Sequence, residues 1–105
     1  MEEITVQQLK SMIESGEDFQ LIDVREGYEK EIADIGGELI PLSEVVDEEE
    51  KIASDKKVVV YCRSGKRSAA AIMELERRFG FDNLYNLKGG ILAWSDEIDS
   101  NIPKY

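Results

Sequence analysis

The chain has 105 residues, of which 42% are hydrophobic and 34% charged, and its formal net charge is −10. This length predicts a single domain, residues 1–105, with one core. The negative charge argues against nucleic acid and anionic membranes as partners, and no apolar run approaches the ~18 residues of a membrane span.

The N-terminal segment predicts a capped helix without a targeting signal. Met1–Ile4 has neither the basic nor the apolar region of a secretory signal, so we expect a soluble, cytoplasmic protein. Thr5 and Gln8 have the spacing of a capping box, and Gly16 stands where a helix would end. The expected helix carries its apolar stripe on Val6, Leu9 and Ile13.

The next forty residues predict two short strands and two charged segments. Residues 19–24 form an apolar run that indicates a strand, and residues 25–35 are charged and partly helical. Pro41 places residues 39–42 at a sheet edge or a strand end. Residues 43–53 contain four consecutive acidic residues, which we interpret as the solvated face of a helix.

Val58–Tyr61 is the strongest strand signal in the chain. Its β-branched residues do not alternate with polar ones, which indicates burial on both faces at the centre of a parallel sheet. Residues 68–79 predict a helix that Gly80 ends. The apolar stripe expected on this helix consists of Ile72, Leu75 and Phe79.

Residues 84–87 predict a last strand, and Gly89–Gly90 lead into a final helix. This helix carries the apolar residues Ile91, Trp94 and Ile98. Strands that alternate with helices over this length predict an α/β fold with a mostly parallel sheet.

The segment of residues 58–68 combines the features of a reactive site. A buried strand ends at Cys62, and ligands of α/β proteins bind beyond the carboxyl ends of strands. The loop that follows lies at a helix N-terminus, where unpaired backbone N–H groups favour an anion. Gly65 supplies the freedom to turn successive N–H groups inward.

The rest of the composition limits how Cys62 could be activated. The chain has one cysteine and no histidine, so it has no internal disulfide, no C-x-x-C pair and no Cys-His pair. A His-based zinc site is likewise impossible, and we expect neither a metal nor a cofactor. Any nucleophile here must be activated without an imidazole.

Three cations near Cys62 favour a reactive thiolate over a buried core cysteine. Arg63, Lys66 and Arg67 lie within five positions, where a chain with 13 Lys and Arg in 105 residues would place fewer than one. A lone cysteine at a strand end is usually core. The cations and the helix N-terminus instead lower a thiol pKa and attract an anionic ligand.

Four segments, in order, resemble the rhodanese-like domain family over nearly the whole chain. Ile22–Glu26 is similar to the family's D-V-R-E strand end, and Gly36–Leu42 to its G-A-x-x-I-P-L segment. Tyr61–Ser68 resembles the active-site loop, and Leu87–Trp94 the L-x-G-G-x-x-x-W signature.

The resemblance implies a rhodanese-like three-layer sandwich, with a five-stranded, mostly parallel sheet flanked by helices. It also implies sulfur transfer by a ping-pong route through a Cys62 persulfide. The donor would be a small anion such as thiosulfate, and the acceptor cyanide, a thiol or a protein. The loop residues that would bind the donor are Arg63, Ser64, Gly65, Lys66 and Arg67. The expected supporting residues are Asp23, Arg25 and Ser68.

The chain departs from the family pattern before the I-P-L segment. The family commonly has G-H-I-x-G, whereas Ile32–Gly36 occupies this place without a histidine. A similar form occurs in rhodanese domains fused to ubiquitin-activating-like adenylyltransferases, which implies a sulfur-carrier pathway. The physiological donor, the acceptor and the oligomeric state are not readable from the residues.

Two alternative functions stay open at this point. Cysteine-dependent phosphatases use C-x5-R, whereas Cys62 and Arg67 form C-x4-R, a smaller loop with Ser68 in the place of the arginine. The other alternative is a non-catalytic binding module or a redox sensor, because an exposed thiolate oxidises readily.

Overall fold

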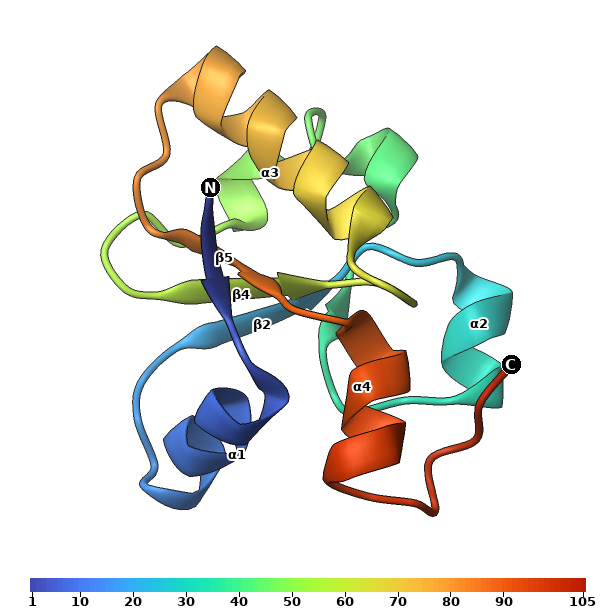
Figure 1. The fold of residues 1–105 in the computed structure, drawn as a ribbon. Coiled ribbons are helices and arrows are strands. Elements are labelled where there is room, and N and C mark those ends of the chain that lie inside the picture. Colours follow the sequence, from blue (N-terminus) through green and yellow to red (C-terminus); the bar gives the residue numbers. More distant parts are fainter.

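The computed structural model describes all 105 residues, which form one parallel sheet between two layers of helices (Figure 1). The five strands stand in the order β1-β5-β4-β2-β3, and every neighbouring pair is parallel. They are β1 (Glu2–Ile4), β2 (Gln20–Asp23), β3 (Glu38–Leu39), β4 (Val58–Tyr61) and β5 (Leu84–Leu87). The expected α/β fold is confirmed.

Strand β4 is the middle strand of the sheet, and both of its faces are buried. Val58 and Val60 face one core cluster, whereas Val59 and Tyr61 face the other. None of the four is more than 1% exposed. The unbroken apolar run therefore has the cause that the sequence indicated: helices cover both sides of a parallel sheet.

The helices divide between the two faces of the sheet. Helices α1 (Val6–Glu14) and α4 (Gly90–Glu97) cover one face, and α3 (Lys66–Phe79) covers the other (Figure 1). Two 3-10 turns, η1 (Leu42–Glu44) and η2 (Glu49–Lys51), lie on the α3 side. Helix α2 (Gly27–Ile32) lies beyond the carboxyl end of β2. No helix has the length and apolar character needed to cross a membrane.

The helix expected over residues 43–53 is wrong, because only the two 3-10 turns form there. Like charges three and four residues apart repel on a helix surface, and this segment places Glu44, Asp47 and Glu48 in that relation. Val45 and Ile52 are buried and anchor the segment to the core in irregular backbone.

The ends and stripes of the helices differ in detail from the expectations. In α1 the buried residue after Leu9 is Met12, and Ile13 is 47% exposed, so the stripe runs at a spacing of three residues rather than four. Helix α3 begins at Lys66 instead of residue 68, and its last residue Phe79 is 43% exposed. The capping box of Thr5 is confirmed, as is the left-handed Gly80 after α3.

Strand β1 was not identified from the residues, although the family resemblance implied five strands. It pairs only with β5, and its two glutamates are exposed. An edge strand of three residues with two charged side chains carries too little apolar pattern to be recognised.

The parallel arrangement brings the carboxyl ends of β2, β4 and β5 to one edge of the sheet. Cys62 follows β4 directly, Arg25 follows β2 by two residues, and Gly89 follows β5 by two residues. Residues far apart in the sequence therefore meet at this edge, where α/β proteins bind their ligands.

A fully buried ion pair fixes the end of β2. The Arg25 guanidinium donates to both carboxylate oxygens of Asp23, at 2.9 and 2.8 Å, and both side chains are 0% exposed. The Arg25 backbone N–H also donates to Asp23 at 3.0 Å. Each charge is thus compensated inside the protein, where an unpaired one would be costly.

We predict that Asp23→Ala lowers the free energy of unfolding by about 3–5 kcal/mol, because the Arg25 charge stays buried without its partner. The matched control is Asp18→Ala, whose carboxylate is 85% exposed in its pair with Lys56, and there the loss should stay below about 1 kcal/mol. Urea unfolding at neutral pH measures both. Equal losses in the two variants would contradict the assigned role of the buried pair.

Candidate active site

Cys62 lies between the central strand β4 and the N-terminus of α3, with its side chain turned into the protein. The residue is 1% exposed and belongs to the core cluster on the α3 side of the sheet. Its thiol is free. The sulfur is therefore almost completely shielded from solvent.

The first residues of α4 orient the backbone of the cysteine loop. The Ile91 N–H donates to the Cys62 carbonyl at 3.0 Å, and the Leu92 N–H donates to the Arg63 carbonyl at 3.1 Å. All peptide bonds are trans, so the N–H of each of these peptide units points opposite to its carbonyl. The loop carbonyls thus face α4, and the following N–H groups face the other way.

Gly90 makes this close approach of α4 to the loop possible. A Cβ atom at Gly90 would lie 2.5 Å from the Arg63 carbonyl oxygen and 2.6 Å from the Cys62 carbonyl oxygen. The residue also has a φ of +61°, a conformation that disfavours any residue with a side chain. The glycine at position 90 therefore allows a close backbone approach, and its partner is the cysteine loop.

The sulfur of Cys62 accepts hydrogen bonds from the loop. The Gly65 N–H donates to Sγ at 3.1 Å, and the Ser68 hydroxyl lies 3.4 Å from Sγ. Burial alone raises the pKa of the Cys62 thiol, but hydrogen bonds from the Ser68 hydroxyl and from the N–H groups of Ser68, Gly65 and Ser64 outweigh it. The pKa of Cys62 is consequently lower than that of an ordinary thiol.

Two further contacts tie the loop to β5. Asn86, which is 4% exposed, donates through Nδ2 to the Gly65 carbonyl at 3.1 Å. Its Oδ1 lies 2.6 Å from the Ser68 hydroxyl oxygen. Gly65 itself has a φ of +103°, which explains the glycine at the start of α3. Asn86 therefore contacts Gly65 and Ser68, two of the residues that donate to the sulfur.

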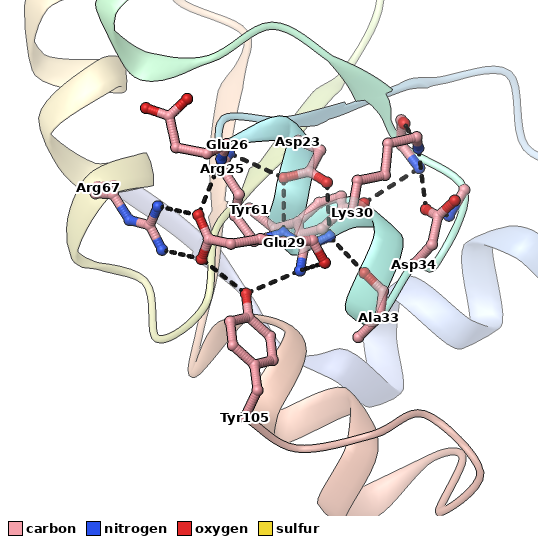
Figure 2. A network of polar contacts seen from close by, with 12 residues as sticks. Asp23, Arg25, Glu26, Glu29, Lys30, Ala33, Asp34, Tyr61, Arg67 and Tyr105 are labelled. Atoms are coloured by element: carbon pink, nitrogen blue, oxygen red, sulfur yellow. Dashed lines mark hydrogen bonds and ion pairs between the residues drawn. The ribbon is translucent and has the colours of Figure 1, made fainter.

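Arg67 reaches from the first turn of α3 to a buried carboxylate on α2 (Figure 2). Its guanidinium donates to both oxygens of Glu29, at 2.6 and 2.8 Å, and Glu29 is only 3% exposed. The hydrogen bonds from Arg67 are the main reason why the pKa of Glu29 falls to about 2. The charge of Arg67, expected to serve an anionic ligand, is thus largely neutralised within the protein.

Asp23 and Arg25 belong to the same network (Figure 2), and neither of them is a hydrogen-bond partner of the Cys62 sulfur. Arg25 donates to the Tyr105 hydroxyl at 2.9 Å, and that hydroxyl donates to Glu29 at 2.9 Å. The bracing role expected for this pair is therefore indirect. It runs through Tyr105 and Glu29 to Arg67 in the first turn of α3.

The other two loop cations occupy the surface. The Arg63 guanidinium lies 5.1 Å from the centre of the Tyr105 ring and donates to the Tyr105 carbonyl oxygen. Lys66 is exposed at the first residue of α3, and Ser64 is exposed beside it. Arg63 and Lys66 are therefore the exposed positive charges beside the cysteine loop.

Sequence reasoning missed three residues of this site. Asn86 offered a weak signal, because asparagine is uncommon in a buried strand such as β5. Glu29 gave none, since it is one of several charged residues between positions 25 and 35. Tyr105 gave none either, because only the fold brings it beside Arg25 and Arg63.

The comparison with family models matches residues 5–97 to the rhodanese-like domain. The chain belongs to the rhodanese-like domain family. The stretch that matches contains the cysteine loop and every strand except β1.

Relatives of this rhodanese-like domain are named as sulfurtransferases. It is 36% identical to the probable adenylyltransferase/sulfurtransferase MoeZ of Mycobacterium tuberculosis over 97% of its own length. It is 38% identical over 72% of its length to the adenylyltransferase and sulfurtransferase UBA4 of Saccharomyces cerevisiae. The chain spans only 26% and 17% of these relatives. Both names combine an adenylyltransferase with a sulfurtransferase. The Ile32–Leu42 segment resembles one in rhodanese domains of such fused proteins, as noted from the sequence.

Solved structures share the fold over nearly the whole chain. A rhodanese-related protein from Thermoplasma volcanium is 31% identical, with a TM-score of 0.81 over 93% of this chain and 94% of that one. A rhodanese-like domain protein from Staphylococcus aureus is 28% identical, with a TM-score of 0.82 over 93% and 95% of the two chains.

We predict that Gly90→Ala separates α4 from the cysteine loop, because its new Cβ would overlap the carbonyls of Cys62 and Arg63. Gly16→Ala is the matched control: Gly16 has a φ of +70°, yet nothing lies within 4 Å of a Cβ there. Both variants should lose about 1–2 kcal/mol of stability to the left-handed backbone. Gly90→Ala alone should lose additional stability, because of the overlap with the loop carbonyls. It alone should also change the pH dependence of Cys62 alkylation. An unchanged alkylation profile would show that α4 does not shape the loop.

Proposed function

We propose that this chain is a sulfurtransferase that carries a sulfane sulfur on Cys62. The observation that carries the proposal is the setting of the sulfur: backbone N–H groups and the Ser68 hydroxyl surround it at a helix N-terminus. This arrangement stabilises a negative charge at the end of the central strand. Membership of the rhodanese-like family and relatives named sulfurtransferase support the same reaction.

In the first half of the reaction the Cys62 thiolate attacks the outer sulfur of thiosulfate. A bond forms between Sγ and that sulfur, the sulfur–sulfur bond of thiosulfate breaks, and sulfite leaves with the electron pair. One negative charge thereby moves from Sγ to the terminal sulfur of a persulfide. The low exposure of Cys62, 1%, favours a donor that presents a slim terminal sulfur.

In the second half an acceptor attacks the terminal sulfur of the persulfide. Cyanide takes the sulfur to form thiocyanate, and the electron pair of the broken bond returns to Sγ, which regenerates the thiolate. A thiol on a small molecule or on a protein acts in the same way after losing its proton. No metal or cofactor enters either step.

The basic residues have different roles in this proposal. Lys66 and Arg63, both exposed beside the cysteine loop, attract the anionic donor. Arg67 instead fixes the first turn of α3 through Glu29, with Asp23 and Arg25 behind it. Ser64 and Gly65 supply N–H groups, and Ser68 supplies its hydroxyl.

The geometry favours sulfur transfer over phosphate chemistry. A phosphatase loop needs an arginine facing the tetrahedral anion, but here Arg67 is held by Glu29 and Ser68 fills the following position. Ser68 is 0% exposed and packs against the sulfur, which leaves little space for a phosphoryl group.

We predict that the wild-type protein gains the mass of one sulfur atom after incubation with thiosulfate and loses it again with cyanide. The readout is intact mass, and Cys62→Ser is the control that should gain nothing. A wild type that stays at its original mass, with a thiol that still reacts with an alkylating agent, would contradict the proposed function.

We predict that Lys66→Gln raises the KM for thiosulfate several-fold and leaves kcat nearly unchanged, because Lys66 attracts the dianion but does not contact the reacting sulfur. The increase should shrink as salt concentration rises, since salt screens exposed charges. Lys10→Gln, which removes an exposed charge on α1, is the matched control. Equal kinetics of the two variants at low salt would refute the role given to Lys66.

A further inference from the structure

The Ser68 hydroxyl has two neighbours that compete for its single proton. Its oxygen lies 2.6 Å from Asn86 Oδ1 and 3.4 Å from Cys62 Sγ. A serine hydroxyl carries one hydrogen and can donate it to one of these atoms at a time. Ser68 is 0% exposed, so no solvent compensates the atom that is left without it.

The orientation of Asn86 follows from its other contact. The Asn86 side chain donates through Nδ2 to the Gly65 carbonyl at 3.1 Å, which requires the amide nitrogen on that side. Oδ1 is therefore directed at Ser68 and can only accept. Asn86 is 4% exposed, so this acceptor also depends on Ser68 for its hydrogen bond.

We propose that Asn86 is a positioning residue that competes with the Cys62 sulfur for the Ser68 proton, and that this competition favours the sulfur-loaded state of the protein. The inference rests on the proposed sulfur transfer for its functional meaning. The competition itself rests only on the three side chains and their distances.

The hydroxyl proton moves with the charge of the reacting sulfur. In the free thiolate the charge is on Sγ, so Ser68 turns its proton to Sγ and Asn86 Oδ1 loses its donor. After attack on thiosulfate and departure of sulfite, the charge is on the terminal sulfur, and Sγ is a neutral, weak acceptor. Ser68 then donates to Asn86 again. The persulfide state thus keeps the buried hydrogen bond between Ser68 and Asn86, which the thiolate state loses.

The charged groups around the sulfur do not take part in this exchange. Arg67 of α3 is paired with Glu29 of α2, and Arg25 is paired with Asp23 at the end of β2. The loop itself carries the exposed Arg63 and Lys66, and the contact from β5 is the uncharged Asn86. None of these charges changes when the Ser68 hydroxyl rotates.

A double-mutant cycle of Asn86→Leu and Ser68→Ala tests the competition. The first readout is the rate of Cys62 alkylation as a function of pH, which needs no sulfur donor. Asn86→Leu leaves the sulfur as the only acceptor for Ser68, so the midpoint of the profile should move to lower pH. The variant also loses the contact with Gly65, and the same substitution in the Ser68→Ala background measures that effect alone.

The second readout is the loading equilibrium, measured by intact mass at fixed ratios of thiosulfate to sulfite. Asn86→Leu should reduce the ratio of persulfide to thiolate about fivefold, the factor that corresponds to one ordinary hydrogen bond. In the Ser68→Ala background the same substitution should have little effect. Asn83→Leu is the matched control, because Asn83 donates to two backbone carbonyls, of Ala53 and Lys56, away from the cysteine loop.

The outcomes separate this inference from the proposed function. A profile midpoint that Asn86→Leu shifts only when Ser68 is present, with Asn83→Leu unchanged, supports the competition. Equal shifts in both backgrounds, or an upward shift confined to the Ser68 background, would overturn it. If wild type takes up no sulfur at all, the proposed function fails, and the alkylation cycle still decides whether Asn86 competes for the proton.

Discussion

The contact between the N-terminus of α4 and the cysteine loop is the constraint on which the rest of the site depends. Two α4 N–H groups bind the carbonyls of Cys62 and Arg63, and Gly90 leaves the space for them. Because each peptide unit is planar and trans, binding the carbonyls on one side directs the N–H groups to the other. The backbone geometry of the cysteine loop thus depends on a glycine almost thirty residues later in the chain, at the start of the helix that follows β5.

Most charged residues near Cys62 are paired with one another and hold the start of α3 in place, and only a few are free to attract an anion. In a chain with a net charge of −10, a basic loop suggests an anion-binding surface. Arg67 is instead bound to Glu29, which joins α3 to α2 and, through Tyr105, to the buried Arg25 (Figure 2). A flexible loop would lose the N–H geometry at the sulfur, so fixing its first helical turn supports the same chemistry as a free charge would. In the proposed function, the attraction of the anionic donor is then left to the exposed Lys66 and Arg63.

The sequence predicted those features whose signal is local. The buried strand β4 and the capping box at Thr5 depend on neighbouring residues, and the structure contains them. The loop after Cys62 is present too, although it ends at Gly65 because α3 begins at Lys66. Features that depend on contacts between distant segments were out of reach. The edge strand β1 has no apolar pattern of its own, and the partner of Arg67 lies 38 residues away. A run of acidic residues has the pattern of a solvated helix face, but repulsion between like charges three and four residues apart opposes a helix over residues 43–53.

Because the chain has no histidine, no imidazolium helps to lower the pKa of Cys62. Burial opposes the thiolate, and the hydrogen bonds of the loop and of Ser68 favour it, with a net lowering of the pKa. A neighbouring imidazolium would stabilise the thiolate by its charge, whatever the orientation of a single hydroxyl. Here each neutral hydrogen-bond donor accounts for a larger share of the lowered pKa of Cys62. A buried amide such as Asn86 therefore affects that pKa by accepting the hydrogen bond of Ser68. In the proposed reaction, the charge on the sulfur then decides whether Cys62 Sγ or Asn86 Oδ1 receives that proton.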